Sequence, residues 1–162
     1  MKKKIYLFTD TFPYGSSETF LANELPFTAM AFDKVVIIPL HGKGEIRDMP
    51  SNVELWESLL SFSPKKKLSL LIKGKFNITP IFWALPEFFN KKVFLSLTRC
   101  WLFFTSLLLT RAILANRSFR QKLYANIEPE DILYFYWSDK SALLLPFLRK
   151  RLNNKTIVRF HG

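Results

Sequence analysis

Two short segments of this chain carry residue types that bind phosphate and sugar groups. The first, 12–20, reads Phe-Pro-Tyr-Gly-Ser-Ser-Glu-Thr-Phe. Gly15 lets the backbone approach a ligand closely, and Ser16 stands at the predicted start of a helix, where free amide groups favour anions. The segment lacks the spacing of a GxGxxG fingerprint. An ordinary capped turn therefore explains these residues as well as phosphate binding does.

The second segment, Tyr136-Trp137-Ser138-Asp139, places two aromatic rings beside a carboxylate. Aromatic rings stack on the apolar faces of sugars, and a carboxylate accepts hydrogen bonds from hydroxyl groups. Alternatively, Trp137 packs in the core and Ser138 or Asp139 caps the following helix. Capping does not exclude a role in binding, so both interpretations stay open.

Other candidate groups are weaker. His41-Gly42-Lys43-Gly44 has the composition of a phosphate loop, but no helix pattern follows it, so we favour a mobile surface loop. His161 stands alone at the end of a predicted strand, where a structural histidine is the commoner case. Two distant histidines and the single Cys100 indicate neither a metal site nor a nucleophile triad.

Composition limits the class of protein. A chain of 162 residues with 49% hydrophobic and 23% charged residues is long and apolar enough for one folded domain and is not disordered. Its one cysteine excludes an internal disulfide and favours a reducing compartment. The basic start Met1-Lys2-Lys3-Lys4 precedes only about five apolar residues, which is too few for a secretory signal.

A parallel sheet is the scaffold that would position the two segments. Strand patterns lie at 4–9, 35–38, 53–56, 131–137 and 156–160. We expect one helix from a cap at Ser16 or Ser17 to about Phe32, kinked or shortened by Pro26, and another after Trp137 to about residue 152. The order predicts an α/β fold: a Rossmann-like, mostly parallel sheet with helices on both faces and a helical basic insertion.

The insertion, at about 60–125, carries the whole net charge of +11 through twelve lysine or arginine residues and one acid, Glu87. Twelve of the 26 aromatic residues lie in the same window. We predict helices at 65–73 and 80–89 and one long helix from near Asn90 to Tyr124. A narrow polar stripe should follow that long helix at spacings of three, four or seven, formed by Lys92, Ser96, Arg99, Ser106, Thr110 and Arg117.

A membrane surface suits this insertion better than nucleic acid, because its apolar content is high and no nucleic-acid-binding motif is present. We expect aromatic and leucine side chains to insert while basic groups meet anionic lipid. The residues proposed for that surface are Lys65, Lys66, Lys67, Arg99 and Trp101. The longest uncharged stretch of the long helix, 100–110, is short of the roughly 20 residues that a span needs. Alternatively, the apolar face packs as core, within this domain or against another.

Three segments, in order along the chain, resemble the N-terminal half of bacterial GT-B glycosyltransferases, of the glycosyltransferase family 4 type found in capsule, exopolysaccharide and lipopolysaccharide synthesis. They are Phe12-Pro13-Tyr14-Gly15 with Glu18-Thr19-Phe20 and Glu24, then Tyr136-Trp137-Ser138-Asp139, then Arg159-Phe160-His161-Gly162. The insertion shows no pattern of that family.

The resemblance implies that residues 1–162 form the acceptor-side domain of a two-domain transferase, whose donor-binding C-terminal half is absent here. The whole enzyme would move a sugar from a nucleotide-sugar donor to a lipid-linked or polysaccharide acceptor, in the cytoplasm or at the inner membrane face, without a metal ion or other cofactor. The resemblance assigns Gly15 and Ser16 to the donor phosphates, Glu18, Thr19, Tyr136, Trp137 and Asp139 to the acceptor, and His161 to catalysis at the transferred sugar. No nucleic acid is expected as a partner.

Two other classes of function remain. One is a non-enzymatic module that binds a membrane surface or a partner protein. The other is a dinucleotide-binding domain, which is disfavoured because GxGxxG is missing after the first strand.

If the resemblance holds, this chain alone binds nucleotide sugars weakly or not at all, because recognition of the nucleotide belongs to the other half of such enzymes. Calorimetry with uridine- and guanosine-diphosphate sugars should give no micromolar binding, and turnover should match the background. Micromolar affinity would require a different assignment of the domains.

Overall fold

The computed structural model describes residues 3–60, 79–138 and 141–160. The chain forms two compact units: residues 1–61 together with 121–162, and residues 62–120. The first unit contains a parallel sheet and the second contains the helices of the insertion. The predicted α/β fold class is confirmed.

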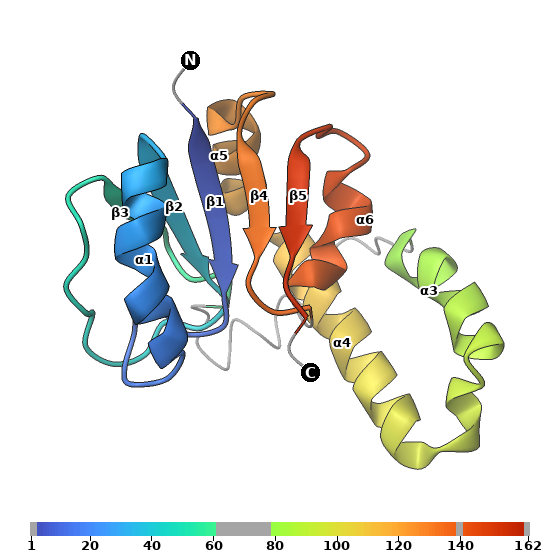
Figure 1. Ribbon diagram of the computed structural model, residues 1–162. Coiled ribbons are helices and arrows are strands. Elements are labelled where there is room, and N and C mark those ends of the chain that lie inside the picture. Colours follow the sequence, from blue (N-terminus) through green and yellow to red (C-terminus); the bar gives the residue numbers. More distant parts are fainter. Residues whose placement is uncertain (1–2, 61–78, 139–140, 161–162) are drawn as a thin grey trace. The chain divides into compact units, whose positions relative to one another are not determined.

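Five strands form one parallel sheet in the order β3-β2-β1-β4-β5 (Figure 1). Their bounds are Lys4–Thr9 for β1, Lys34–Pro39 for β2, Val53–Leu55 for β3, Ile132–Phe135 for β4 and Lys155–Val158 for β5. The chain starts in the middle of the sheet, builds outward to β3, and resumes at β4 on the other side of β1. The point where the strand order reverses, which is the usual ligand site of such sheets, therefore lies between β1 and β4.

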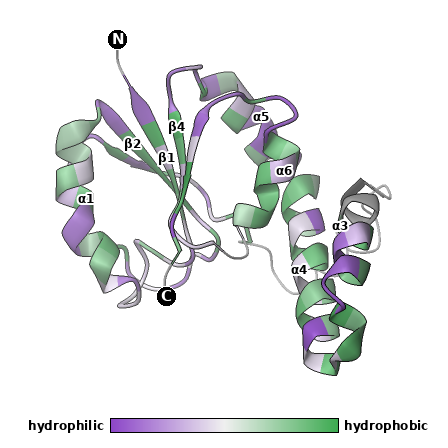
Figure 2. Cartoon of the chain, turned by 45° about the vertical axis from the view of Figure 1, so that its right-hand side comes forward, coloured by the Kyte–Doolittle hydropathy of each residue, from purple (hydrophilic) through white to green (hydrophobic). Residues whose placement is uncertain are grey.

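Helices cover both faces of this sheet. The helix α1 (Thr19–Ala31) lies on one face, and α5 (Arg117–Asn126) and α6 (Leu145–Leu148) lie on the other (Figures 1 and 2). Successive side chains of a strand point to opposite faces. Accordingly, Ile5 and Leu7 pack with Leu21 of α1, whereas the ring of Phe8 stacks on that of Phe135 at a centroid distance of 4.3 Å.

The start of α1 differs from the predicted one. The helix begins at Thr19, after Glu18, whose backbone is left-handed with φ 53° and whose side chain makes no capping bond. The expected cap at Ser16 or Ser17 is therefore wrong, and the Ser17 hydroxyl bonds instead to the hydroxyl of Thr11. Pro26 lies inside the helix, which continues to Ala31.

The predicted long helix is also wrong. In its place stand a 3₁₀ turn η1 (Val93–Leu95), α4 (Leu97–Ala115) and α5, whereas the helix predicted at 80–89 is confirmed as α3 (Thr79–Asn90). The first break is at Lys92, which has φ 49°. The second is at Asn116, whose Oδ1 accepts the Phe119 amide at 3.0 Å and so caps α5. The predicted helix at 65–73 lies outside the described residues.

The helix predicted after Trp137 is much shorter than expected. It is reduced to a 3₁₀ turn, η2 (Ala142–Leu144), followed by the single turn of α6. Pro146 stands at the start of α6, where its missing amide proton does no harm.

The buried Asp131 joins the amino ends of the strands β1, β4 and β5 to the loop that follows α5. Its Oδ1 accepts the Lys4 amide at 2.9 Å, where β1 begins, and its Oδ2 accepts the Glu128 amide at 2.8 Å, in the loop after α5. The side-chain amide of Asn154, just before β5, donates to the carbonyl of Asp131 at 3.0 Å. Removal of this carboxylate leaves two amides without their acceptor.

We therefore expect Asp131→Ala to lower the free energy of unfolding by about 2–3 kcal/mol, because charge-assisted bonds to a buried acceptor are lost. Urea denaturation followed by circular dichroism measures this change. The neighbouring exposed Glu130 supplies the control, and Glu130→Ala should stay within about 0.5 kcal/mol of the wild type. Equal effects of the two substitutions would contradict the assigned role of Asp131.

Candidate functional site

A hollow of about 380 Å³ opens at the carboxyl edge of the sheet, beside the point where the strand order reverses. It is lined by Asp10, Thr11, Ser17, Glu18 and Trp137. The first four residues belong to the loop between β1 and α1, and Trp137 follows β4. The hollow thus combines hydroxyl and carboxylate groups with one aromatic ring.

The Glu18 carboxylate lies at the centre of this arrangement. Its Oε2 accepts the amides of Phe12 at 2.6 Å and Thr11 at 2.7 Å, and the Thr11 hydroxyl at 3.1 Å. Its Oε1 accepts the amide of Asp10 at 3.1 Å and the indole Nε1–H of Trp137 at 2.5 Å. One side chain therefore holds the turn after β1 in shape and ties it to the residue that follows β4, 119 positions further along the chain.

The ionisation of Glu18 follows from these contacts. Burial by itself would raise the pKa of this carboxyl. The hydrogen bonds from the Phe12 and Thr11 amides, the Trp137 indole and the Asp10 amide outweigh burial and hold the pKa below its ordinary value. Glu18 is therefore a carboxylate at neutral pH.

The same contacts bear on the acceptor-binding role predicted for Glu18. A carboxylate has about four lone-pair positions, and five donors already occupy them. A direct bond from Glu18 to a sugar hydroxyl would replace one of these donors. The geometry therefore favours Glu18 as the group that positions the Trp137 ring. The hydroxyl groups of Thr11 and Ser17 also line the hollow and are the better candidates for bonds to a ligand.

A second set of contacts surrounds Tyr136. Its ring meets that of Trp137 edge-on at 5.5 Å, and the guanidinium of Arg159 lies 4.8 Å from its centroid. Arg159 Nη1 bonds both carboxylate oxygens of Glu24, at 2.6 and 2.8 Å. Tyr136 is fully buried, so its ring supports Trp137 from the core and is not exposed for stacking on a ligand.

Gly15 lies in the same loop but does not line the hollow. It has φ 63°, and its amide donates to the carbonyl of Glu45 at 3.0 Å. The Arg47 guanidinium donates to the carbonyl oxygens of Gly15 at 2.6 Å and Ser17 at 2.5 Å. A donor phosphate near Gly15 would thus meet an amide that already has an acceptor, while Ser16 and Thr19 are exposed.

The segment 41–44 is a surface loop, as expected, and it lies against the loop that follows β1. The His41 amide donates to the carbonyl of Asp10 at 2.8 Å, and a bridge joins Tyr14 to Ile46. At Gly44, with φ 108°, an added Cβ would lie 3.3 Å from the Gly15 nitrogen. The two loops therefore need glycine where they cross.

Several predicted site residues cannot be placed in this hollow. Asp139, His161 and the three lysines Lys65, Lys66 and Lys67 lie outside the described residues. Because all five strands are parallel, the chain leaves β5 at the same edge as β1 and β4, and the Arg159 amide donates to the carbonyl of Phe135 there at 3.0 Å. The predicted membrane residues Arg99 and Trp101 are exposed on α4 in the second unit.

Sequence reasoning missed two features of the site. Asp10 and Thr11 line the hollow, and their position directly after the first strand could have identified them, since ligands bind where parallel strands end. The ion pair of Glu24 and Arg159 was also missed. No local sequence pattern predicts a contact between residues 135 positions apart.

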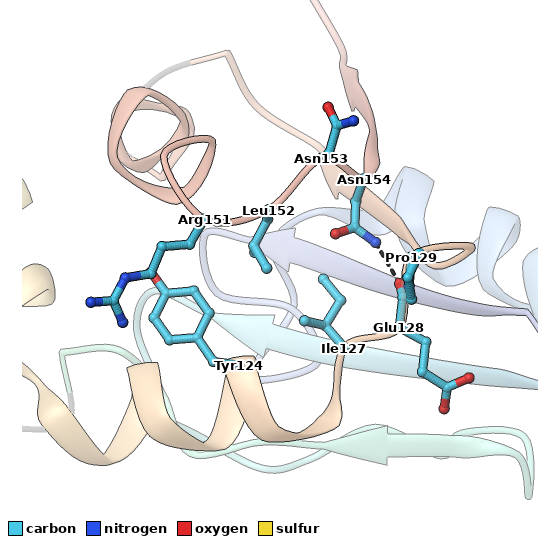
Figure 3. A pocket seen from close by; sticks show the side chains of 8 residues that line it. All are labelled: Tyr124, Ile127, Glu128, Pro129, Arg151, Leu152, Asn153 and Asn154. Atoms are coloured by element: carbon cyan, nitrogen blue, oxygen red, sulfur yellow. Dashed lines mark hydrogen bonds between the residues drawn. The ribbon is translucent and has the colours of Figure 1, made fainter.

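A larger hollow, of about 680 Å³, lies at the opposite, amino edge of the sheet (Figure 3). Two of its polar side chains, Asn154 and Arg151, make contacts within the protein. The Asn154 amide donates to the carbonyl of Glu128 at 2.6 Å, and the Arg151 guanidinium lies 5.4 Å from the centroid of the Tyr124 ring. Size alone does not make this the candidate site, because ligands of parallel sheets bind at the carboxyl edge.

We expect Glu18→Gln to destabilise the fold by about 2–3 kcal/mol at pH 7, because the amide group that replaces one oxygen cannot accept hydrogen bonds. The folded-state pKa of Glu18 is depressed, so its stabilisation is present above the unfolded-state pKa of about 4.3 and is lost as the pH falls through the folded-state pKa. The difference from wild type should therefore shrink in acid.

Urea denaturation between pH 7 and pH 3 tests this expectation. Glu57→Gln, at an exposed glutamate, is the matched control and should show little difference at any pH. A loss of stability in Glu18→Gln that is the same at both ends of the range would show that the charge of Glu18 does not act as described.

Comparisons with protein-family models, with curated proteins and with solved structures found no match to this chain. What can be said of its function therefore rests on the sequence and on the geometry of this site.

Proposed function

We propose that this chain supplies the acceptor-side half of a glycosyltransferase that moves a sugar from a nucleotide-sugar donor to a lipid-linked or polysaccharide acceptor. The observation that carries the proposal is the fixed position of the Trp137 ring at the edge of a hydroxyl-lined hollow. The proposal is consistent with the Rossmann-like sheet, and the resemblance of three ordered segments to such enzymes supports it.

The chemistry of the hollow suits a saccharide. Sugars present apolar C–H faces and rings of hydroxyl groups, so an aromatic ring beside hydroxyl and carboxylate groups meets both needs. Asp10, Thr11 and Ser17 would bond to sugar hydroxyls, and Trp137 would stack on the ring. The bond from Nε1–H to Glu18 lies in the plane of the indole, so this bond does not itself cover a face of the ring.

The roles of the remaining residues stay as the resemblance assigns them. Gly15 and Ser16 would lie toward the donor phosphates, Thr19 and Asp139 toward the acceptor, and His161 would act at the transferred sugar. The donor is a substrate, and no resident cofactor forms part of the proposal. Transfer itself would require the donor-binding half of the enzyme.

Saturation-transfer NMR with a panel of mono- and disaccharides tests the acceptor site directly. We expect weak, millimolar binding by the wild-type chain, lost in Trp137→Ala. Trp137→Phe keeps a ring for stacking but loses the bond to Glu18, so it should retain part of the saturation transfer while the protein becomes less stable.

Tyr124→Ala, at the hollow on the opposite edge of the sheet, is the control and should leave the saccharide signals unchanged. If no saccharide gains saturation from the wild-type protein, the acceptor-side assignment fails and a non-enzymatic module becomes the better interpretation. Equal loss in Tyr124→Ala and Trp137→Ala would likewise count against the proposed site.

A further inference from the structure

The second unit presents a continuous set of exposed apolar side chains. Nine large apolar residues between positions 85 and 108 are exposed, and they include Leu97 at 91% and Trp101 at 71% of their full accessible surface. The others are Leu85, Phe89, Phe94, Leu95, Leu102, Phe104 and Leu108. Single exposed apolar residues are ordinary, but a contiguous group marks a contact surface.

Four of these residues form a stripe along α4. Leu97, Trp101, Phe104 and Leu108 follow one another at spacings of four, three and four, so they share one side of the helix. The stripe is about 16 Å long at 1.5 Å per residue. Figure 2 shows α4 as a largely hydrophobic helix interrupted by a few hydrophilic residues.

The hairpin of α3 and α4 is also joined by contacts between aromatic rings. The ring of Phe88 meets those of Phe103 at 5.2 Å, Phe104 at 5.9 Å and Phe94 at 6.2 Å. Phe104 takes part in these contacts and is still 51% exposed, while the exposed Leu97, Trp101 and Leu108 extend the stripe on either side of it.

The polar side chains of α4 would not lose hydrogen bonds if the stripe were covered by an apolar partner. Arg99, Ser106 and Thr110 of the predicted polar stripe are on the side of the helix opposite Leu97 and Leu108. Thr105 donates its hydroxyl to the Trp101 carbonyl at 2.8 Å, as Thr110 does to the carbonyl of Ser106 at 2.9 Å. Such bonds within the helix spare these hydroxyls the cost of losing water.

The charges around the stripe indicate which kind of partner binds there. Basic residues bracket the stripe, with Lys91 and Lys92 before it and Arg111 one turn after Leu108, and Glu87 is the single acid among residues 79–120. Apolar side chains flanked by cations are the pattern of a helix that lies in the headgroup region of an anionic leaflet. A surface for single-stranded nucleic acid combines aromatic rings with a groove lined by basic residues, whereas the cations here lie at the two ends of an apolar stripe.

The length and composition of α4 also suit contact with a membrane. Among the described residues it is the one helix that is long and apolar enough to cross a membrane by length and composition, with 19 residues and a mean hydropathy of 1.4. The sequence alone indicated that the uncharged stretch 100–110 is too short to span a membrane. The whole helix meets the length for a span because it extends beyond Arg99 and Arg111 at its two ends. The exposed cation Arg99 on the side opposite the stripe favours a helix lying in the interface over one that spans.

We propose that the stripe Leu97, Trp101, Phe104 and Leu108 docks the chain on an anionic lipid surface, with Lys91, Lys92 and Arg111 against the headgroups. The docking goes beyond the transferase function and does not require it. It also does not depend on the three lysines at 65–67.

Co-sedimentation with vesicles tests the proposal, using phosphatidylcholine alone and phosphatidylcholine with phosphatidylglycerol. The wild-type chain should pellet with the anionic vesicles, and 0.5 M salt should weaken that binding. Leu97→Glu should reduce the binding at least tenfold. Met30→Glu adds the same charge at an 85% exposed apolar residue of α1 and should bind like wild type.

Brominated lipids report on the depth of Trp101. They should quench part of the wild-type tryptophan fluorescence, and Trp101→Phe, which keeps an aromatic ring, should still bind but lose that part. Equal binding by Leu97→Glu and wild type, or no binding to anionic vesicles, would overturn the proposal. So would a lipid-free dimer that Leu97→Glu converts to monomers, because the stripe would then join two copies of the chain. None of these outcomes depends on whether saccharides bind at Trp137.

Discussion

The carboxylate of Glu18 is the contact on which the rest of the site depends. Its residue adopts a left-handed backbone, which costs a non-glycine residue about 1–2 kcal/mol. Five hydrogen-bond donors offset that cost. The strain is thus tolerated because the side chain organises the turn after β1 and reaches the residue that follows β4. Without it, the loop after β1 would lose its side-chain bond to the residue that follows β4.

Two carboxylates at and near the start of α1 fix the segments that follow β4 and β5 at this edge of the sheet. Glu18 holds Trp137 through its indole, and Glu24, one and a half turns further along, pairs with Arg159, which in turn covers the buried Tyr136. The loops that follow β4 and β5 are therefore both attached to α1. This arrangement places the polar lining of the hollow on loops while the groups that orient it lie on the helix and its entry turn.

The parts of this fold that the sequence predicts are those governed by local periodicity. Continuous apolar runs such as Val35 to Ile38 predict strands buried on both faces, and the sheet confirms them. The break at Asn116 escaped prediction because the hydrophobic pattern runs through it, and only the side-chain cap to Phe119 marks the start of a new helix. The bond from Trp137 to Glu18 could not be predicted, since it depends on a strained backbone and on which strands are neighbours.

The crossing of Gly15 and Gly44 limits how this protein can vary. A side chain at position 44 would press on the backbone of residue 15, and both positions lie in the left-handed region. Drift at one position is therefore coupled to the path of the other loop, so the two glycines should co-vary among homologous chains. An insertion in the segment after β2 would first change the conformation of the turn after β1, although a helix and a strand separate the two segments in sequence.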